Sequence, residues 1–318
     1  MHMKTGGLKI GWYLGDRKAK KSHWIKFDAF VRSQGYSLCA LSCNAEVEES
    51  DYDVILLKLT DQLSVENTNP EASALIRRME LIINSNPQAA VVDSIEAQRL
   101  TVNRRVMHEL IKRLSNVEYI QCPLGFVLNS EEDLRSFSSD LSFPCMVKSG
   151  QASGSLMAHD MGIVWSAKDF GIFPYPIYVE EFINHDATLF KVYVLGDYIS
   201  VVTRNSLPNF PRSGYHPPIC FNSQEWKHTL PPEYMFEYTG KSPRPSDEVV
   251  RGLASEIKRL SNLTLLGFDV IVNAESKKMC VVDLNYFPDY MGVESLQERL
   301  LSHLIKACEM KRRELGGR

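Results

Sequence analysis

The stretch GFDVIVNAESKKMCVVDLN, from Gly267 to Asn285, holds two apolar runs on either side of a polar turn. Each run has the composition of a buried strand, yet Asp269 interrupts the first, and Asp283 and Asn285 lie in the second. Buried carboxylates and amides cost free energy unless something pairs with them. If the two strands pair through the turn at residues 273–278, Asp269 and Asp283 lie side by side. Asn285 then shares a face with Asp283, because it stands two residues further along the strand.

Oxygen donors that converge in this way predict a metal site. Two carboxylates so close repel each other unless a cation lies between them. All-oxygen ligation with few protein groups suits Mg²⁺, which keeps its other positions for water and phosphate oxygens. The alternative is a solvated strand end whose carboxylates are satisfied locally. The apolar residues on either side of both acids favour the metal.

The rest of the composition is that of an ordinary globular protein, with 318 residues, 44% hydrophobic and 24% charged. The net charge of −3 argues against general nucleic-acid binding. Neither a long apolar run nor a signal-peptide hydrophobic region is present, so no membrane insertion is expected. Seven cysteines without a C-x-x-C pair predict reduced thiols and a cytosolic or nuclear location. The P-loop, protein-kinase, zincin and hydrolase-elbow motifs are all absent from the sequence.

Strand and helix patterns alternate over about the first hundred residues, which predicts a parallel α/β sheet. The pattern then changes to an α+β segment with a small antiparallel sheet. The expected strands lie at 8–14, 36–42, 51–61, 89–94, 122–130, 143–150, 159–166, 176–183, 263–272 and 277–287. The expected helices lie at 26–36, 70–86, 95–116, 130–137 (with Ser130 as N-cap), 247–262 and 293–314. A hairpin at 187–207 should turn at Gly196–Asp197, and residues 208–245, with eight of the fifteen prolines, should form a long loop.

Cations gather in places that suit phosphates. The run DRKAKK at 16–21 follows a strand candidate directly, and clustered cations focus negative ligands, although such runs are also typical of solvated turns. Lys148 and Lys191 lie in apolar strand candidates. A strand usually turns lysine outward to solvent, yet lysines are also the usual point-charge partners of nucleotide phosphates. Between them, the glycine-rich GQASGSLMAHDM at 150–161 could cover phosphates with backbone N–H groups.

Together these parts resemble the ATP-grasp superfamily, and within it the inositol 1,3,4-trisphosphate 5/6-kinases. The resemblance runs in order along nearly the whole chain. It is carried by IGWYLGDRKAKK (10–21), DVILLKLTD (53–61), NRR (103–105), FPCMVK (143–148), HDM (159–161), VEEFINHDATLFKVYVLG (179–196), RNSLPNF (204–210), FNS (221–223), RPSDEV (244–249), GFDVIVN (267–273) and VVDLNYFP (281–288). It implies an α/β (α+β) chain with the ATP-grasp fold. An N-terminal parallel α/β domain at 1–118 would precede two α+β domains, at 119–183 and 184–318, that sandwich ATP.

The resemblance also implies a function, namely ATP-dependent phosphorylation of an inositol tris- or tetrakisphosphate by a monomer that uses two Mg²⁺ ions. The residues implied on the ATP side are Arg104, Lys148, the linker Glu180, Glu181, Phe182 and Ile183, and Ser206 and Ser223. Those implied on the inositol-phosphate side are Lys18, Lys58, His159, Lys191, Asn285 and Asp289. Asp269, Asp283 and Asn285 would hold the metal, and Lys191, Arg204 and Asp283 would act at the transferred phosphoryl group.

Two positions depart from the family pattern. Ser153 stands where animal members commonly have a second histidine and plant members an acid. Asp289 stands where the motif ordinarily reads N-x-FPG. A carboxylate near a phosphate is unfavourable at low dielectric, so Asp289 should point away, pair with a lysine or face a free hydroxyl.

The sequence is also compatible with other interpretations of His159 and of the protein's function. His159 is either a phosphate ligand or a partly exposed loop histidine. The chain as a whole could be an ATP-grasp carboxylate–amine ligase that works through an acyl phosphate, or a non-catalytic inositol-phosphate binding protein. A ligase would not need the N-terminal lysines aimed at the acceptor. A pure binder would not need Asp269, Asp283 and Asn285.

Overall fold

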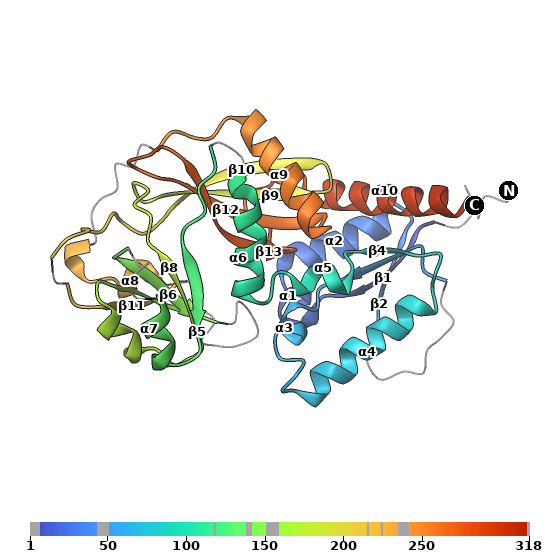
Figure 1. Ribbon diagram of the computed structural model, residues 1–318. Coiled ribbons are helices and arrows are strands. Elements are labelled where there is room, and N and C mark those ends of the chain that lie inside the picture. Colours follow the sequence, from blue (N-terminus) through green and yellow to red (C-terminus); the bar gives the residue numbers. More distant parts are fainter. Residues whose placement is uncertain are drawn as a thin grey trace.

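The computed structural model describes residues 7–42, 51–116, 119–137, 142–150, 159–214, 216–223, 225–234 and 242–316. In this part of the chain the strands form three sheets, arranged along an elongated molecule (Figure 1). One sheet is parallel and two are antiparallel, so the α/β and α+β halves expected from the sequence are confirmed.

The first sheet has the strand order β2-β1-β3-β4, and all its pairs are parallel. Its strands are β1 (Lys9–Tyr13), β2 (Ser37–Ala40), β3 (Val54–Leu57) and β4 (Ala90–Val92). The helices of this region are α1 (Gly15–Ala19), α2 (Ser22–Ser33), α3 (Thr60–Leu63) and α4 (Pro70–Asn84). Every residue of β3 is buried, because helices cover both faces of a parallel sheet.

The single helix expected over 95–116 is wrong, since the chain forms two helices there. Helix α5 (Ile95–Arg99) stops, and α6 (Arg104–Lys112) begins after Asn103, with a 3₁₀ turn at Arg113–Asn116 beyond it. The Asn103 side chain accepts hydrogen bonds from the N–H groups of Arg105 (2.9 Å) and Val106 (3.3 Å). This cap satisfies donors that a new helix exposes and so favours a restart at this point. Because of this break, Arg104 lies in the first turn of α6.

The second sheet has the order β11-β7-β6-β8-β5. Its strands are β5 (Gly125–Leu128), β6 (Cys145–Ser149), β7 (Asp160–Val164), β8 (Ile177–Glu181) and β11 (Ile219–Asn222), with short helices at Glu131–Asp133, α7 (Leu134–Phe137) and Ala167–Ile172. One expectation is confirmed here and one needs correction. Ser130 stands at the N-cap position as expected, although its side chain makes no capping hydrogen bond. Residues 208–245 are not a plain loop, because they contain β11, α8 (Trp226–Thr229) and a 3₁₀ turn at Pro232–Tyr234.

The third sheet has the order β10-β9-β12-β13. The hairpin of β9 (Thr188–Leu195) and β10 (Tyr198–Asn205) turns at Gly196–Asp197 as predicted, with Gly196 at φ +61°. Strands β12 (Leu265–Val272) and β13 (Met279–Tyr286) pair antiparallel, and Asp269 lies opposite Asp283. The pairing predicted for the opening stretch of sequence is therefore confirmed. Helices α9 (Asp247–Ser261) and α10 (Leu296–Gly316) complete the chain.

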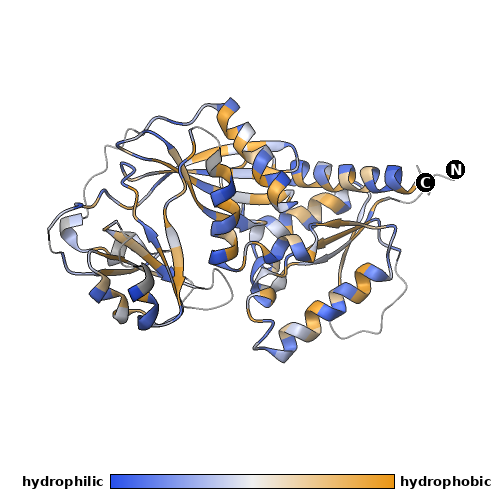
Figure 2. Ribbon diagram, viewed as in Figure 1, coloured by the Kyte–Doolittle hydropathy of each residue, from blue (hydrophilic) through white to orange (hydrophobic). Residues whose placement is uncertain are grey.

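The first and third sheets share one hydrophobic core, whereas the second sheet has apolar clusters of its own. Apolar residues accordingly concentrate where the sheets meet their helices (Figure 2). Buried hydrogen bonds also join the first and third sheets within this shared core. The buried Asp93 carboxylate accepts from Thr264 N (2.8 Å) and Leu265 N (2.9 Å), and the Tyr286 hydroxyl donates to Leu57 O (2.8 Å). Strand β13 is thus fixed against the parallel sheet.

Among the helices of the described residues, none combines the length and the apolar character that crossing a membrane requires.

Candidate active site

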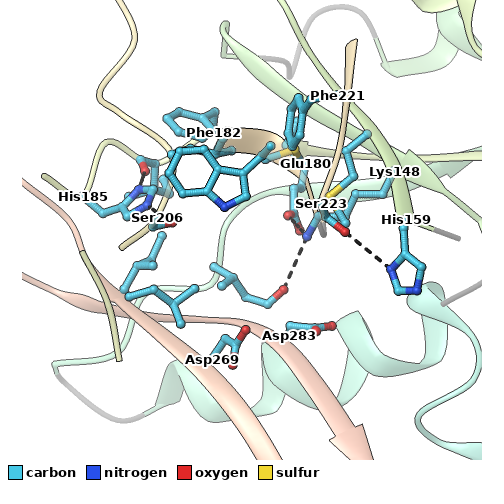
Figure 3. A pocket seen from close by; sticks show the side chains of 18 of the residues that line it. Lys148, His159, Glu180, Phe182, His185, Ser206, Phe221, Ser223, Asp269 and Asp283 are labelled. Atoms are coloured by element: carbon cyan, nitrogen blue, oxygen red, sulfur yellow. Dashed lines mark hydrogen bonds and ion pairs between the residues drawn. The ribbon is translucent and has the colours of Figure 1, made fainter. Parts of the chain in front are cut away.

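A cavity of about 390 Å³ lies between the second and third sheets, and we call it the linker cavity because residues 180–183 line it (Figure 3). Apolar and aromatic side chains form one end, among them Phe182, Phe221 and Trp226. Charged side chains form the other end, including Lys148, Asp269 and Asp283. An apolar slot that leads to cations and carboxylates suits a flat base joined to phosphates.

Lys148 points into the linker cavity from strand β6 and is only 7% exposed. Its ammonium forms an ion pair with the Glu180 carboxylate and donates to Val282 O at 3.4 Å. Arg104, from the first turn of α6, donates through Nε to Ser149 O (2.9 Å) and stands 3.9 Å from Asp283 Oδ1. Two buried cations therefore face the carboxylates of the third sheet.

The linker continues from β8 along the wall of the cavity. The N–H groups of Glu181 and Phe182 donate to Leu124 O (2.9 Å) and Pro144 O (3.0 Å), so these two donors already hold the linker in place. The Phe182 ring packs edge-on against Phe210, with ring centroids 5.0 Å apart.

Buried His185 fixes the end of the linker. Its Nδ1 lies 2.6 Å from Ile183 O, and its Nε2 lies 2.8 Å from Ser206 Oγ. Burial lowers the pKa of His185. Ser206 is therefore tied to the linker through His185.

Asp269 and Asp283 face the cavity (Figure 3). Asn285 also lines it. Lys191 Nζ forms an ion pair with Asp269 Oδ1 at 2.9 Å. Burial raises the pKa of Asp269 to about 6, and the nearby Asp283 adds to this rise while Lys191 opposes it. Although burial alone would raise the pKa of Asp283, the charges of Arg104, Lys148 and Lys191 lower it.

The side-chain oxygens of Asp269, Asp283 and Asn285 are suitable ligands for a divalent cation. Asp269 and Asp283 lie opposite each other on paired strands, and a divalent cation would offset the repulsion between their carboxylates. Asn285 Nδ2 donates to Asp283 Oδ2 at 2.7 Å, which orients both side chains on one face of β13. In the part of the chain that the structure describes, no three acidic, histidine or cysteine side chains are placed so that they could hold a metal ion together. A metal here would therefore need the Asn285 amide as its third protein ligand.

A second cavity, of about 840 Å³, opens between the first and third sheets, and we call it the cationic cavity. Among the described residues, six cationic side chains line it, against two acids. They are Arg17, Lys18, Lys21, Lys58, Lys191 and Arg204, and the acids are Asp61 and Asp289. Exposed Arg204 donates to Met291 O at 3.0 Å, and Arg17 pairs with Asp61 at 3.0 Å.

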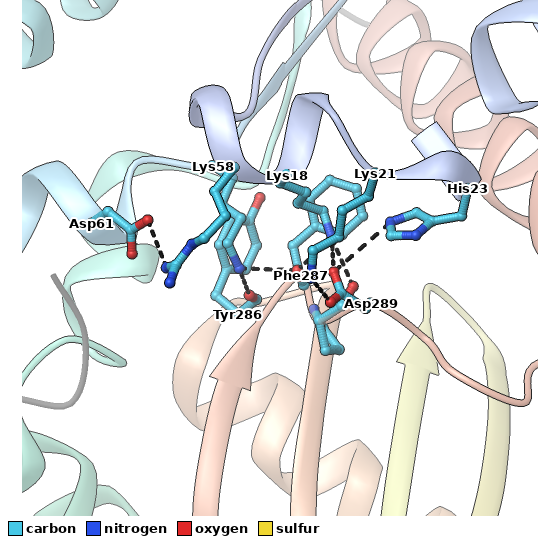
Figure 4. Close-up of polar contacts among 10 residues, drawn as sticks. Lys18, Lys21, His23, Lys58, Asp61, Tyr286, Phe287 and Asp289 are labelled. Carbon is cyan, nitrogen blue, oxygen red and sulfur yellow. Dashed lines mark hydrogen bonds and ion pairs between the residues drawn. The ribbon is translucent and has the colours of Figure 1, made fainter. Parts of the chain in front are cut away.

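Lys18 and Lys58 are held by the backbone that follows β13 (Figure 4). Lys18 Nζ donates to Phe287 O (2.9 Å) and Pro288 O (2.8 Å), and Lys58 Nζ donates to Tyr286 O (2.6 Å) and Phe287 O (3.0 Å). Burial, followed by the charge of Lys58, lowers the pKa of Lys18 to about 7. Burial likewise lowers the pKa of Lys58 to about 8, although Asp61 and Asp289 oppose this. Anionic ligands would favour the protonated form of both groups.

Asp289 pairs with lysines, one of the three arrangements expected from the sequence. Its carboxylate contacts Lys21, lies 3.4 Å from Lys18 Nζ, and lies 3.8 Å from His23 Nε2 (Figure 4). Burial raises the pKa of Asp289, but Lys21 and Lys18 outweigh it and hold the pKa below its usual value.

Four residues line both cavities: His159, Lys191, Ser223 and Asn285. His159 Nδ1 lies 3.5 Å from Ser223 Oγ, and burial together with Arg17 and Arg104 lowers the pKa of His159. The two cavities therefore meet at the side chains of a lysine, a histidine, a serine and an asparagine.

All of the sequence-predicted site residues line one of the two cavities. The glycine-rich segment at 151–158, with Ser153, lies outside the described residues. Sequence reasoning missed the Lys148–Glu180 ion pair, the tie between His185 and Ser206, and Trp226. His185 lies in the INH motif, which could have indicated it. Trp226 lies in the segment expected to be a loop and gave no signal.

Comparison with known proteins bears on this arrangement. Residues 118–306 match the family model of the inositol 1,3,4-trisphosphate 5/6-kinase ATP-grasp domain, which is more than half of the chain. The chain belongs to this family. It is 31% identical to an inositol-tetrakisphosphate 1-kinase of Danio rerio, over 95% of this chain and 80% of the relative, and 30% identical to one of Xenopus laevis, over 94% and 78%.

Solved structures show the same fold at low sequence identity. The ATP-grasp ligase PsnB complexed with minimal precursor aligns with a TM-score of 0.61 at 15% identity, over 94% of this chain and 99% of the ligase. A D-alanine–D-alanine ligase from Bacillus anthracis complexed with ATP aligns with a TM-score of 0.58 at 14% identity, over 98% of this chain and 100% of that one. The ATP-grasp fold is therefore confirmed for this family member.

Proposed function

We propose that this protein is an ATP- and Mg²⁺-dependent inositol polyphosphate kinase. The observation that carries the proposal is the junction of the two cavities, where His159, Lys191, Ser223 and Asn285 line both. A phosphoryl group on the donor side can reach a hydroxyl on the acceptor side only where the two sites touch. Six cations around the second cavity suit a small and densely anionic acceptor.

On the donor side, the linker cavity would take ATP. Phe182 and Ile183 would line the base, with Glu181, Ser206 and Ser223 on the same side. Arg104 and Lys148 would contact the phosphates, and Glu180 would hold the Lys148 ammonium in position. Asp269, Asp283 and Asn285 would hold Mg²⁺, as two ions, and the metal would neutralise charge on the phosphate oxygens.

On the acceptor side, Lys58 and His159 would bind phosphates of the inositol ring, and Lys18 would add its positive charge beside them. Lys191 and Arg204 would stabilise charge at the transferred group, because both line the cationic cavity and Lys191 also lines the donor side. A ring hydroxyl oxygen forms a bond to the γ-phosphorus, the bond from that phosphorus to the β–γ bridging oxygen breaks, ADP leaves, and the hydroxyl proton passes to solvent. Such transfers need alignment and charge stabilisation more than a covalent group of the protein.

We propose three domains at 1–118, 119–183 and 184–318, acting as a monomer. Two segments cross these boundaries. Strand β11, from the last domain, completes the second sheet. Helix α10 contacts β3, β4 and α2 of the first domain.

The test is incubation with ATP, Mg²⁺ and a panel of inositol phosphates, with products resolved by ion-exchange chromatography. The expected result is one new phosphate on an inositol phosphate for each ADP released. ADP release with an amino acid or peptide instead would indicate a ligase. Tight inositol-phosphate binding without turnover would indicate a binding protein.

A further inference from the structure

Asp289 lies where a substrate phosphate would be expected to bind. It follows β13 by three residues, lines the cationic cavity, and keeps about a third of its side chain exposed. Its carboxylate contacts Lys21, Lys18 and His23, which come from the segment around α1 and the start of α2 (Figure 4). The Asp289 carboxylate therefore already compensates the positive charge on this side of the cavity.

The hydrogen bonds of Lys18 show how completely it is engaged. An ammonium group has three N–H donors. The Lys18 ammonium donates to Phe287 O (2.9 Å), Pro288 O (2.8 Å) and Asp289 Oδ1 (3.4 Å), and also lies 4.1 Å from the Phe287 ring centre. While Asp289 stays in place, no donor of Lys18 remains for a ligand.

Lys58 provides the contrast. Two of its donors go to Tyr286 O and Phe287 O, and the described residues include no ion pair to it. In the same cavity, Lys58 thus keeps one N–H donor that a ligand could use, whereas the charge of Lys18 is already compensated by the Asp289 carboxylate. A phosphate on the Lys58 side meets a positive charge, whereas one on the Lys18 side meets a carboxylate.

We propose that Asp289 determines acceptor specificity by standing in for one phosphate. The ring position that faces Lys18 and Lys21 then carries a free hydroxyl, which donates to the Asp289 carboxylate, and acceptors with a phosphate at that position are rejected. This inference rests on the proposed function and adds to it the substitution pattern of the acceptor. Like charges held close together at a partly buried site repel strongly, whereas a hydroxyl donor to a carboxylate is favourable.

The test compares wild-type protein with Asp289→Asn, which keeps the size of the side chain and removes its charge. Binding is measured by calorimetry, with Mg²⁺ and a non-hydrolysable ATP analogue present, for pairs of inositol tris- and tetrakisphosphates that differ by a single phosphate. Wild-type protein should bind one tetrakisphosphate at least tenfold more weakly than its parent trisphosphate. Asp289→Asn should remove most of that difference and change the parent's affinity by less than threefold.

Asp61→Asn is the matched control, because Asp61 is the other acid of the cavity and pairs with exposed Arg17. It should shift the affinities of all members of the panel by similar factors. Equal effects of the two substitutions, or an unchanged preference in Asp289→Asn, would overturn the proposal. If Asp289→Asn does not fold by thermal melting, Asp289→Ser serves the same comparison. Absence of any inositol-phosphate phosphorylation by wild-type protein would instead refute the proposed function, and the calorimetric preference would still test Asp289.

Discussion

Raising the pH from 7 to 9 should weaken acceptor binding steeply. Lys18 has a pKa of about 7 and Lys58 a pKa of about 8, both lowered by burial, so both ammonium groups lose their protons across this range. The acceptor itself changes little, because phosphate monoesters have a second pKa near 6 and are almost fully ionised above pH 7. The negative charge of an acceptor bound in the cavity favours the protonated lysines, so binding takes up protons and becomes weaker as pH rises.

The two pKa values set the size of the effect. If Lys18 is protonated in the complex, the acceptor Kd rises by about 50-fold between pH 7 and 9, because the protonated fraction falls from about a half to about a hundredth. Lys58 adds a further factor of about 10 on the same reasoning. Since the charge of Lys58 lowers the pKa of Lys18, the two proton losses are coupled, and the product of the two factors is an upper bound.

Calorimetry measures this directly, through the acceptor Kd at several pH values and through proton uptake in buffers of different ionisation enthalpy. Lys18→Arg keeps a charge that does not titrate in this range, so it should flatten the pH dependence at the Lys18 step. Affinity for the ATP analogue serves as the internal control, because neither lysine lines the linker cavity. An acceptor Kd that stays within threefold from pH 7 to 9 would refute the reasoning.

Two further predictions concern β13. Asp283→Asn should lower kcat by about 10²–10³-fold with little change in melting temperature, because it removes a charged ligand that would hold Mg²⁺ against the reacting phosphates. Asp160→Asn, which alters an exposed acid of β7 bonded to Asn222, is the control, and near-normal turnover in Asp283→Asn would exclude the metal role. Tyr286→Phe should destabilise the fold by about 2–4 kcal/mol, because the buried hydroxyl accepts from Asp93 N (2.7 Å) and donates to Leu57 O (2.8 Å), and both groups would lose their partner. Thermal melting beside Tyr198→Phe measures this, and equal melting temperatures would contradict it.

The sequence predicts those parts of the site that depend on local pattern. A six-residue turn between two apolar runs determines the pairing of β12 with β13, and that pairing brings Asp269 opposite Asp283. The period of two then puts Asn285 on the same face. These relations need only the residues between 267 and 285.

Contacts between distant segments leave no such pattern. The ion pair of Lys148 with Glu180 joins neighbouring strands whose register is not encoded in either strand alone. The break before Arg104 depends on Asn103 acting as a cap, which competes with continuing the helix. Strand β11 is only four residues long and lies among prolines, so its apolar alternation is too short to stand out. The orientation of Asp289 depends on Lys18 and Lys21, which lie about 270 residues earlier in the chain.

The end of β13 couples the two substrate sites. Asp283 and Asn285 face the linker cavity, and the next three carbonyls, of Tyr286, Phe287 and Pro288, hold Lys58 and Lys18 in the cationic cavity. Phe287 adopts φ +42°, in the left-handed region, which costs a residue with a side chain about 1–2 kcal/mol. Hydrogen bonds from two ammonium groups offset this cost. Because one short run of backbone positions both the phosphate side and the acceptor lysines, a shift of β13 would misalign donor and acceptor together. This explains why the strand is anchored to the first sheet through the buried Tyr286 hydroxyl.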